Sequence, residues 1–553
     1  MQKYAEWYWL NKASRDFLSK GYLLPNVTAE QRIKEIAYVA ESYLGIPGYA
    51  DKFIDYMSKG WFSLSSPVWS NYGNARGFSV SCFGGYTPDS TDGILYTLGE
   101  QGMLTKMGGG TSIYLGAVRG RGEPITNNGT SNGSVSFLRL FNTMTDVISQ
   151  GQTRRGYMAA YMPMEHKDIE DFLNIGSDGN EIQELMTGVT VSDEFMNGVL
   201  LGDPDKVKLW KYMLKKRSEH GYPYIMFSDT VNRNKPECYK DMPVLASNLC
   251  SEIALPSNDK ETFICVLSSM NLLHYDEWKD TDAVEVLTMF LDSVVTDFIT
   301  KLEMYTKDSV FLDRVYNFAK NHRALGLGVL GWHSYLQSKS ISFESREAAR
   351  LNYNIFKQIK ERSYKASEEL GAKHGCVMGT NRRNTTTMAV APTKSSSFIL
   401  GQVSQGIEPI MSNYFVNETA KAIHVYKNPA LLELLNTLGK NTDEVWESIS
   451  KADGSVQHLE FLTQEQKDVF KTFAEINPYA IIDQAATRQE HIDQAQSLNL
   501  MIPPSMKLKD INALYFHAWR MGVKTLYYQF AMSAAQEFNR NKYMSKECVS
   551  CSG

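Results

Sequence analysis

The sequence predicts an α/β protein, because short apolar segments of strand length alternate with longer amphipathic helical patterns. The segments "YIMF" (224–227), "TFICVL" (262–267) and "TMAVAP" (387–392) have the length and composition of buried strands. Helical patterns separate them along the chain, as in folds whose strands are linked by helices. Glycine-rich stretches such as "KMGGGTS", "RGRGEP" and "NNGTSNGS" indicate loops between these elements.

Two helices are predicted with defined ends. The first begins at a capping box formed by Thr28 and Gln31, carries an apolar stripe, and ends at Gly45. The second begins near Ser345 and ends at Gly371.

The composition excludes several classes of protein. The chain has 553 residues, of which 43% are hydrophobic and 12% aromatic, so it can bury a large core and is not mainly disordered. Its net charge of −5 gives no basic field, so nucleic acid is not an expected partner. No apolar run approaches the ~18 residues that span a bilayer, and the N-terminus has no apolar signal core. We therefore expect a cytoplasmic protein that does not enter a membrane.

The cysteines are too few and too irregularly spaced for a disulfide framework. There are seven, namely Cys82, Cys238, Cys250, Cys265, Cys376, Cys548 and Cys551. We expect reduced thiols that are either buried or catalytic, and we expect no metal site within the chain.

The segment "SNLCSEIALPS" places Asn248, Cys250 and Glu252 at alternate positions. In an extended segment these side chains point the same way. A glutamate can then take a proton from a hydroxyl, an asparagine can hold a hydroxyl, and the thiol can act as a nucleophile or a one-electron carrier. Considered alone, the segment is also compatible with a strand that has a buried cysteine and two solvated polar groups.

Two further cysteines lie in apolar, strand-like surroundings. Cys82 is in "SVSCFGGY" and Cys265 is in "FICVLSS". Each can be a small core residue. They can instead approach each other and form a dithiol that donates two electrons, and their spacing in the sequence does not decide between these alternatives.

The segment "VAPTKSSSFILG" joins an apolar strand to a possible helix start. Backbone N–H groups and hydroxyls at such a start can bind phosphate, although the Walker A pattern is absent. An ordinary helix cap is the alternative.

The adjacent tyrosines Tyr527 and Tyr528 and the C-terminal pair Cys548 and Cys551 complete the candidate residues. Adjacent tyrosines usually serve packing, but they can also relay an electron and a proton. The terminal C-x-x-C lacks the second pair of a zinc site and the following helix of a thioredoxin motif. A mobile redox shuttle that works by thiol–disulfide exchange remains.

Together these segments resemble the large (alpha, catalytic) subunit of class I ribonucleotide reductase. The resemblance covers nearly the whole chain and keeps the family's motif order. It is carried by "SLSSPVWSN", "VSCFGG", "SNLCSEI", "ICVLSSMNL", "PTKSSS", "VKTLYYQ" and "ECVSC". The tail motif is most similar to that of the class Ib branch.

The resemblance implies roles for these residues. Cys250 is the expected thiyl-radical site, with Asn248 and Glu252 as partners of the substrate hydroxyls. Cys82 and Cys265 are the expected reducing pair, Tyr527 and Tyr528 the stacked radical-transfer pair, and Cys548 and Cys551 the shuttle to an external thioredoxin- or glutaredoxin-like reductant. The expected substrate contacts are Ser66, Ser81, Gly109, Pro392, Thr393, Lys394, Ser395 and Ser396.

The same resemblance implies ligands and partners. The substrate is a ribonucleoside diphosphate, and the radical comes from the metallocofactor of a separate beta subunit. No cofactor is bound covalently to this chain. Asp89 and Arg119 are the expected contacts of a dNTP or ATP specificity effector, which Mg²⁺ accompanies, and an alpha homodimer is possible.

The implied fold is a ten-stranded α/β barrel of two five-stranded halves with a central finger loop. We expect a helical segment over 1–65, the barrel over 66–537 and a redox-active tail over 538–553. The chain begins directly with the helical segment, so the ATP-cone that often precedes it, and its overall control by dATP, are not expected.

Two relatives with the same barrel compete with this interpretation, as does a non-catalytic regulator. A cobalamin-dependent class II reductase shares Cys250 and the reducing pair but does not need Tyr527 and Tyr528. A class III enzyme needs a glycyl-radical motif, which "KECVSCSG" is not. A non-catalytic nucleotide-binding relative is expected to have lost at least one of these cysteines or their polar partners.

Overall fold

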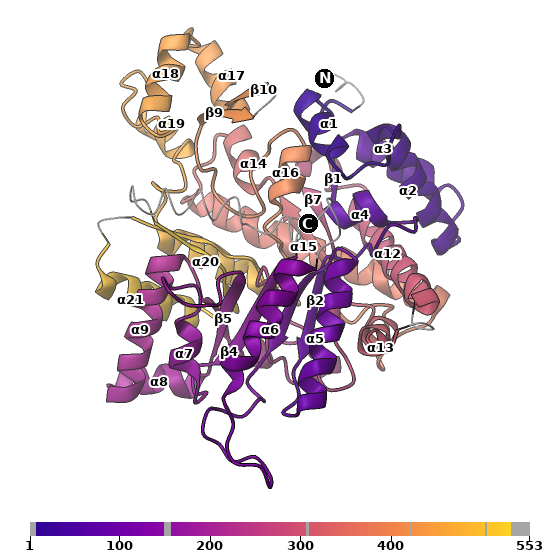
Figure 1. Cartoon of the computed structure of the whole chain (residues 1–553). Helices are drawn as coiled ribbons and strands as arrows, with labels where there is room; N and C mark the ends of the chain where they lie inside the picture. The colour runs from indigo at the N-terminus through magenta and orange to yellow at the C-terminus, as the bar shows by residue number, and fades with distance from the viewer. Residues whose placement is uncertain (1–6, 149–155, 306–308, 420–421, 504–505, 532–553) are drawn as a thin grey trace.

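The computed structural model describes residues 7–148, 156–305, 309–419, 422–503 and 506–531 (Figure 1). The chain begins with three helices and a short strand, which pack on the outside of the barrel. These elements are α1 (Lys12–Ser19), α2 (Ala29–Leu44), α3 (Tyr49–Ser58) and β1 (Phe62–Leu64). Among the helices of these ranges, none combines the length and apolar character that crossing a bilayer requires.

One half of the barrel is a parallel sheet in which neighbouring strands follow one another along the chain. Its strands are β2 (Cys82–Tyr86), β3 (Gly110–Tyr114), β4 (Met158–Pro163), β5 (Leu185–Val191) and β6 (Tyr224–Phe227). Parallel neighbours need crossover connections. Helices provide them, namely α5 (Thr91–Lys106), α6 (Ser134–Val147), α7 (Ile169–Leu173), α8 (Asp193–Leu201) and α9 (Pro204–His220).

The other half consists of five segments that also run parallel to one another. β7 (Phe263–Asn271) pairs with β8 (Leu325–Leu330), and single bridges link Leu327 to Met388 and Val390 to Gln496. β11 (Leu500–Ile502) then pairs with β13 (Gln529–Ala531). The apolar segment 387–392 is therefore part of the barrel, although it is bridged at single residues and is not a regular strand.

Two antiparallel seams close the barrel. β2 pairs with β7 at one seam, and β6 pairs with β12 (Thr525–Leu526) at the other. Within the described residues this joins two five-membered halves into one ring, which confirms the ten-stranded α/β barrel expected from the sequence. β1 adds to β7 beyond the first seam.

Helices surround the second half and the seams (Figure 1). They are α4 (Ser66–Asn71), α10 (Ser228–Arg233), η1 (Glu237–Tyr239), η2 (Leu272–His274), α11 (Tyr275–Trp278), α12 (Ala283–Tyr305), α13 (Asp313–His322), α14 (Trp332–Ser338), α15 (Arg346–His374), α16 (Lys394–Ile399), α20 (Pro478–Gln489) and α21 (Leu508–Arg520).

A small unit with its own core lies beside the barrel, at the upper left of Figure 1. It contains the hairpin β9 (Tyr414–Thr419) and β10 (Ala422–Lys427), followed by α17 (Pro429–Thr437), α18 (Asp443–Lys451) and α19 (Gln464–Val469). Trp446 and Leu435 are among its fully buried residues.

The predicted helix ends are confirmed at three of four positions. α2 has the capping box of Thr28 and Gln31 and ends at Gly45, whose φ of 59° is left-handed. α15 is capped by Ser345 but continues to His374, so the predicted end at Gly371 is wrong. A Cβ at Gly371 would lie 3.0 Å from the backbone of residues 382 and 383. This glycine therefore permits close packing inside the helix and does not end it.

Candidate active site

A buried loop without helix or strand lies inside the barrel. Every residue of 246–257 is buried, and the backbone turns sharply where the Ser251 N–H donates to the Asn248 carbonyl at 3.3 Å. Ser251 has a φ of 65°, in the left-handed region. The extended conformation predicted for Asn248, Cys250 and Glu252 is therefore wrong, because this turn reverses the chain. The expected finger loop is present.

Strands of both barrel halves hold this loop. The Tyr161 hydroxyl of β4 donates to the Asn248 carbonyl at 2.8 Å. From the other half, the Ala495 N–H donates to the Glu252 carbonyl at 2.9 Å, and the Ser497 hydroxyl lies 2.6 Å from the Cys250 carbonyl. The loop is thus anchored on two sides, which fixes the positions of its side chains.

Cys82 and Cys265 are direct partners across the β2–β7 seam. Directly opposed residues of antiparallel strands have Cα atoms about 4.5–5.5 Å apart, a separation at which a disulfide can form. Both side chains are fully buried, and both are thiols in this structure. Burial raises the pKa of the Cys265 thiol well above its usual value, against a hydrogen bond from Gln494 at 3.4 Å.

Two side chains of the finger loop reach this thiol pair. The Asn248 amide donates to the Cys82 sulfur at 3.3 Å, and the Cys82 thiol lies 3.7 Å from the Glu252 carboxylate. Desolvation raises the pKa of Glu252 to about 7, although hydrogen bonds from its own backbone, Asn248, Ser497 and Cys82 oppose this. The carboxyl can therefore gain or lose a proton near neutral pH.

The radical-transfer candidates lie next to Cys250. The Tyr527 hydroxyl is 3.6 Å from the Cys250 sulfur. The rings of Tyr527 and Tyr528 have centroids 4.4 Å apart and planes inclined by 59°. They are in contact, but they are tilted and not stacked as predicted. Tyr224 packs against both rings, with centroid distances of 4.8 and 5.2 Å.

The expected substrate contacts lie on separate elements. Ser66 begins α4, and Ser81 precedes β2; both are buried. Within the described residues, the Ser81 hydroxyl oxygen has no hydrogen-bond partner. A Cβ at Gly109 would lie 2.3 Å from the Phe83 ring, so no larger residue fits there without rearrangement.

The "PTKSSS" segment forms the predicted junction between a barrel segment and a helix. Thr393 has a φ of 54° and precedes α16, which begins at Lys394. Its hydroxyl accepts from the Gly406 N–H at 2.7 Å. Ser396 contacts the carbonyl of Leu64 at 3.4 Å, which places this junction beside the strand that leads to Ser66. Pro392 and Ser395 belong to the same junction.

The expected effector residues are brought together away from the cysteines. Asp89 follows β2, Arg119 follows β3, and their side chains form an ion pair at 2.9 Å. The Arg119 backbone N–H also donates to Asp89 at 3.1 Å. The loop after Arg119 contains a bridge between Pro124 and Thr130 and projects at the bottom of Figure 1.

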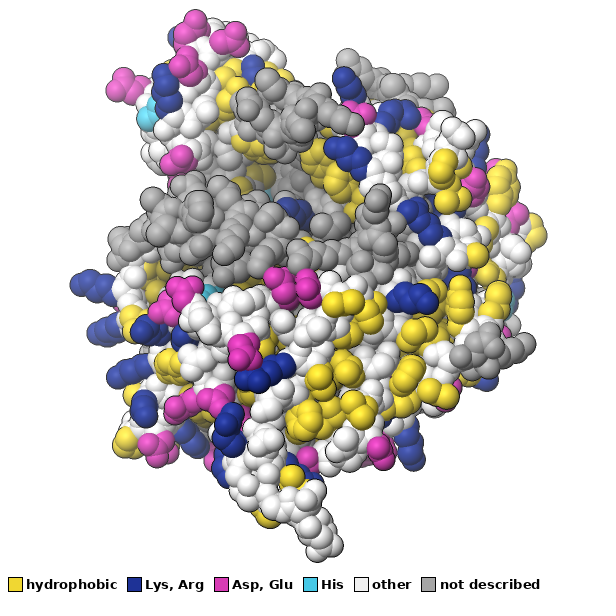
Figure 2. Space-filling view, in the orientation of Figure 1, with side chains coloured by type: hydrophobic (Ala, Val, Ile, Leu, Met, Phe, Trp, Pro, Cys, Tyr) yellow, Lys and Arg dark blue, Asp and Glu magenta, His cyan; other side chains and the backbone are white. Residues whose placement is uncertain are grey.

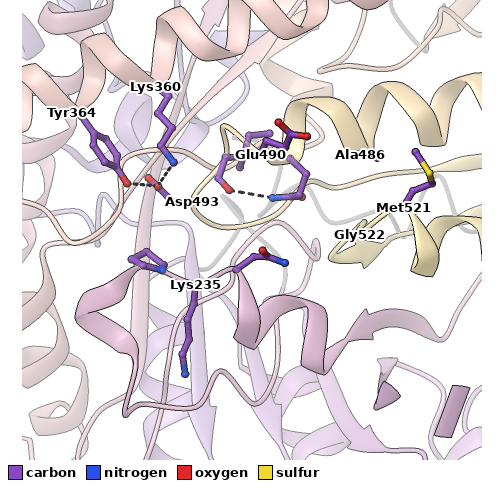
Figure 3. A pocket seen from close by; sticks show the side chains of 12 residues that line it. Lys235, Lys360, Tyr364, Ala486, Glu490, Asp493, Met521 and Gly522 are labelled. Carbon is purple, nitrogen blue, oxygen red and sulfur yellow. Dashed lines mark hydrogen bonds and ion pairs between the residues drawn. The ribbon is translucent and has the colours of Figure 1, made fainter. Parts of the chain in front are cut away.

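A cavity of about 360 Å³ lies at the barrel end where the segments of the second half begin (Figure 3). Lys360 and Tyr364 of α15 point at the buried Asp493, at 3.2 and 2.5 Å. Asp493 precedes Gln494, which contacts Cys265. The cavity thus borders the segment that contacts Cys265.

Sequence reasoning missed Gln494 and Ser497, because neither belongs to a motif that was singled out. Only the three-dimensional structure identifies them, because it shows that segment 494–498 contacts the finger loop. Cys548 and Cys551 lie outside the described residues.

Comparisons with known proteins agree with this arrangement. A family model described as "Ribonucleotide reductase, barrel domain" matches residues 80–205, 203–382 and 377–529. The solved structure of the Actinobacillus ureae class Id ribonucleotide reductase alpha subunit is similar with a TM-score of 0.90 and 52% identity, covering 96% of this chain and 99% of that chain. The tail motif is most similar to that of class Ib, whereas this similar structure is named as class Id.

Viral proteins are also similar over most of their length. A Frog virus 3 (isolate Goorha) protein is 35% identical over 93% of this chain and 94% of its own. The ribonucleoside-diphosphate reductase large subunit of Invertebrate iridescent virus 3 is 34% identical over 87% of both chains. With the barrel, the buried finger loop and the paired cysteines in place, these matches show that the chain belongs to the ribonucleotide reductase large-subunit family.

Proposed function

We propose that this chain reduces ribonucleoside diphosphates to 2′-deoxyribonucleoside diphosphates through a thiyl radical on Cys250, and so supplies precursors of DNA. The observation that carries the proposal is the convergence of Cys250, the Cys82–Cys265 pair and Tyr527 in one buried centre. A buried centre suits a radical, because water and other side reactants are kept out.

Radical transfer to Cys250 follows the tyrosine contacts. A hydrogen atom passes from Tyr527 to an oxidised Tyr528, and then from the Cys250 thiol to Tyr527 across the 3.6 Å contact. Each transfer moves one electron and one proton together, so neither leaves a buried charge. The oxidised state originates in the metallocofactor of a separate beta subunit.

Reduction then uses the groups around the finger loop. The Cys250 thiyl removes the 3′ hydrogen of the substrate, and the Glu252 carboxylate takes the proton of the 3′ hydroxyl. The 2′ hydroxyl leaves as water. Cys82 and Cys265 supply two electrons and two hydrogens and become a disulfide. Glu252 then returns its proton to the 3′ oxygen, and the 3′ hydrogen returns from Cys250. Overall, one substrate and two thiols give one product, one disulfide and one water.

Substrate binding is assigned to the elements that border this centre. The buried Ser81 hydroxyl, which has no hydrogen-bond partner among the described residues, is available to a substrate oxygen. Ser66 and Gly109 are assigned to the substrate together with Ser81. The junction of Pro392, Thr393, Lys394, Ser395 and Ser396 is assigned to the diphosphate, where backbone N–H groups of α16 and the Lys394 charge favour an anion.

Turnover needs an external reductant. We assign Cys548 and Cys551 as the dithiol that reduces the Cys82–Cys265 disulfide and is itself reduced by a thioredoxin- or glutaredoxin-like protein. Thiols that must be restored after each cycle suit a reducing compartment, so we place the reaction in the cytoplasm.

Regulation is assigned to the Asp89–Arg119 pair. A dNTP or ATP effector with its Mg²⁺ would compete for the two charges that now pair with each other. The pair lies at the ends of β2 and β3, and β2 carries Cys82. An effector that moves this end therefore acts on a strand of the catalytic centre.

An alpha homodimer is supported by an apolar face on α5 and α6. Leu95, Leu140 and Val147 are 50%, 45% and 74% exposed. Figure 2 shows hydrophobic side chains gathered over these two helices. Exposed patches of this kind mark association sites.

The deciding experiment is reduction of CDP with dithiothreitol, an effector triphosphate and a candidate beta subunit. Product formation that requires both the beta subunit and Cys250 supports the proposal, with Cys250→Ser as the inactive comparison. Activity with adenosylcobalamin and no beta subunit would instead assign the chain to class II. Nucleotide binding without turnover in either assay would favour a regulatory relative.

A further inference from the structure

Segment 494–498 of the barrel runs alongside the finger loop. The Ala495 N–H donates to the Glu252 carbonyl at 2.9 Å, and the Gln494 side chain accepts from the Ala254 N–H at 3.2 Å. Ser497 adds a third contact, since its hydroxyl oxygen lies 2.6 Å from the Cys250 carbonyl oxygen. The same oxygen lies 3.1 Å from Oε2 of Glu252.

Ser497 thus bridges the proposed base and the backbone of the proposed radical residue. It is 2% exposed, and among the described residues its hydroxyl contacts these two groups alone. A serine hydroxyl has one hydrogen to donate, whereas the Cys250 carbonyl and an ionised Glu252 are both acceptors. One hydrogen cannot serve both.

The protonation state of Glu252 decides how the hydrogen is used. When Glu252 is protonated, its O–H donates to Ser497, and Ser497 donates to the Cys250 carbonyl, so every group is satisfied. When Glu252 is ionised, the charge-assisted bond from Ser497 to the carboxylate is the stronger one. The Cys250 carbonyl then loses the hydrogen bond from Ser497.

We propose that Ser497 is a positioning residue that transmits the protonation state of Glu252 to the backbone of Cys250. The role of Ser497 in catalysis rests on the proposed function. The test of the coupling between Glu252 and Cys250 does not depend on it. The inference assigns Ser497 a role that acts through the Glu252 carboxylate and the Cys250 backbone.

The surroundings of Glu252 leave its charge uncompensated. The titratable groups that interact with it are the thiols of Cys82 and Cys265 and the phenol of Tyr161, and the Cys250 thiol belongs to the same loop. They come from β2, the finger loop, β7 and β4, and none carries a positive charge. Burial accordingly raises the pKa of Glu252 to about 7, so both states of the bridge are populated near neutral pH.

The partner of the Ser497 hydroxyl changes in step with the reaction. Glu252 begins ionised and holds the Ser497 hydrogen. After Glu252 takes the 3′-hydroxyl proton, the Ser497 hydroxyl donates to the Cys250 carbonyl. This bond holds the finger-loop tip, meaning the turn at residues 248–251, while Cys250 carries the substrate's hydrogen. Return of the proton releases the tip again. The tip is therefore held during the steps in which Cys250 must return that hydrogen to the same carbon.

The test uses the chain alone, without substrate or beta subunit. Cysteine carbonyl carbons are labelled with ¹³C and followed by NMR, and the Cys250 signal is identified by its loss in Cys250→Ser. The carboxyl titration of Glu252 is followed by infrared difference spectra, identified by its loss in Glu252→Gln. In the wild type we expect the Cys250 carbonyl signal to shift with the same midpoint as the carboxyl.

Ser497→Ala removes the bridge, and Ser247→Ala is its matched control. The Ser247 hydroxyl is also buried, and it lies 2.6 Å from the Ile253 carbonyl and 3.4 Å from the Asn248 side-chain oxygen. Among the described residues, no hydrogen bond joins it to Glu252. We expect Ser497→Ala to uncouple the Cys250 carbonyl from pH and to raise the Glu252 midpoint by about one unit, because a donor to the ionised form is lost. Ser247→Ala should do neither, and Ser497→Thr should restore both.

A Cys250 carbonyl signal that stays constant through the Glu252 titration in the wild type would overturn the inference, even if Ser497→Ala failed to fold. So would equal effects of Ser497→Ala and Ser247→Ala. In the reduction assay, the acid limb of kcat should move up in pH with the Glu252 midpoint. Coupling without any reduction would refute the proposed function alone, and reduction without coupling would refute this inference alone.

Discussion

Cys82 and Cys265 face each other directly across the β2–β7 seam, although the sequence places them far apart. The seam joins the two halves of the barrel, so the proposed dithiol exists only when the barrel is closed. The side chains of Asn248 and Glu252 reach the same position from the finger loop.

Oxidation is expected to join these two cysteines. One turnover of pre-reduced enzyme without an external reductant should consume two thiols and form the Cys82–Cys265 disulfide, as measured by thiol counting and peptide mapping. Cys82→Ser or Cys265→Ser should lower multiple-turnover activity on the order of 10³-fold or more, because the two act as a unit. Cys376→Ser, at an exposed position, is the control. A disulfide that included Cys376 would contradict the assignment.

Activity is expected to rise with pH through about 7. Glu252 must be ionised to accept a proton, and burial raises its pKa to about 7, so protonated enzyme accumulates below that pH and is inactive. The acid limb of kcat/KM reports this group in the enzyme without substrate. Glu252→Gln should lower kcat by about 10²–10⁴-fold and remove that limb from the residual activity. A rate unchanged between about pH 6 and 8 would exclude Glu252 as the base.

Tyr527→Phe is expected to stop radical transfer while leaving the fold intact. The substitution removes the hydroxyl that contacts the Cys250 sulfur but keeps the ring packed against Tyr528. Turnover should fall on the order of 10³-fold or more, and unfolding free energy should change by no more than about 1 kcal/mol.

Tyr224→Phe is the matched control for this change. Its ring packs on the same pair and its hydroxyl lies near Tyr528, but among the described residues no hydrogen bond joins that hydroxyl to the Cys250 sulfur. Equal losses of activity in Tyr224→Phe and Tyr527→Phe would show that packing, and not the Tyr527 hydroxyl, is what matters.

Asp89→Asn is expected to change effector response without changing stability. The Asp89–Arg119 pair is about one-third exposed on both sides, and ion pairs of this kind contribute about 0–1 kcal/mol. Effector affinity, measured by titration calorimetry, should fall by about tenfold, and preference among substrates should weaken. Asp55→Asn, which breaks the exposed pair with Lys59, should leave both unchanged. Undiminished effector binding by Asp89→Asn would remove this site from consideration.

Glu100→Gln is expected to stabilise the protein at alkaline pH. Glu100 is a fully buried residue of α5, and desolvation raises its pKa from 4.5 to about 7. A raised carboxyl pKa gives stability that is present at low pH and is lost as pH rises through about 7. The shift corresponds to at most about 3 kcal/mol.

Urea unfolding of wild type and Glu100→Gln should therefore agree near pH 4 and diverge near pH 9, in favour of the variant, by up to about 3 kcal/mol. Asp51→Asn, at an exposed position of α3, should show no such divergence. A variant that is less stable than wild type at both pH values would mean that the ionised carboxylate is needed by its neighbours.

Local patterns predicted local structure well. The capping box at Thr28 and Gln31 and the cap at Ser345 are present, because a cap depends on residues within one helical turn. The end at Gly371 was wrong, since close packing against a distant segment, and not the end of the helix, requires that glycine. The extended conformation of 248–252 was wrong for a similar reason, since the turn at Ser251 is held by contacts from both barrel halves.

The sequence by itself determined which residues are the candidates for the chemistry. Cysteines, a glutamate, an asparagine and paired tyrosines identified the proposed centre, because their motifs resemble those of the family. Only the tertiary structure decided which of them meet. Closure of the two seams opposes Cys82 to Cys265, places Tyr527 on Cys250 and brings Ser497 between Cys250 and Glu252. These contacts join distant parts of the chain, and no local pattern encodes them, because they form only when the whole barrel is closed and its core excludes water.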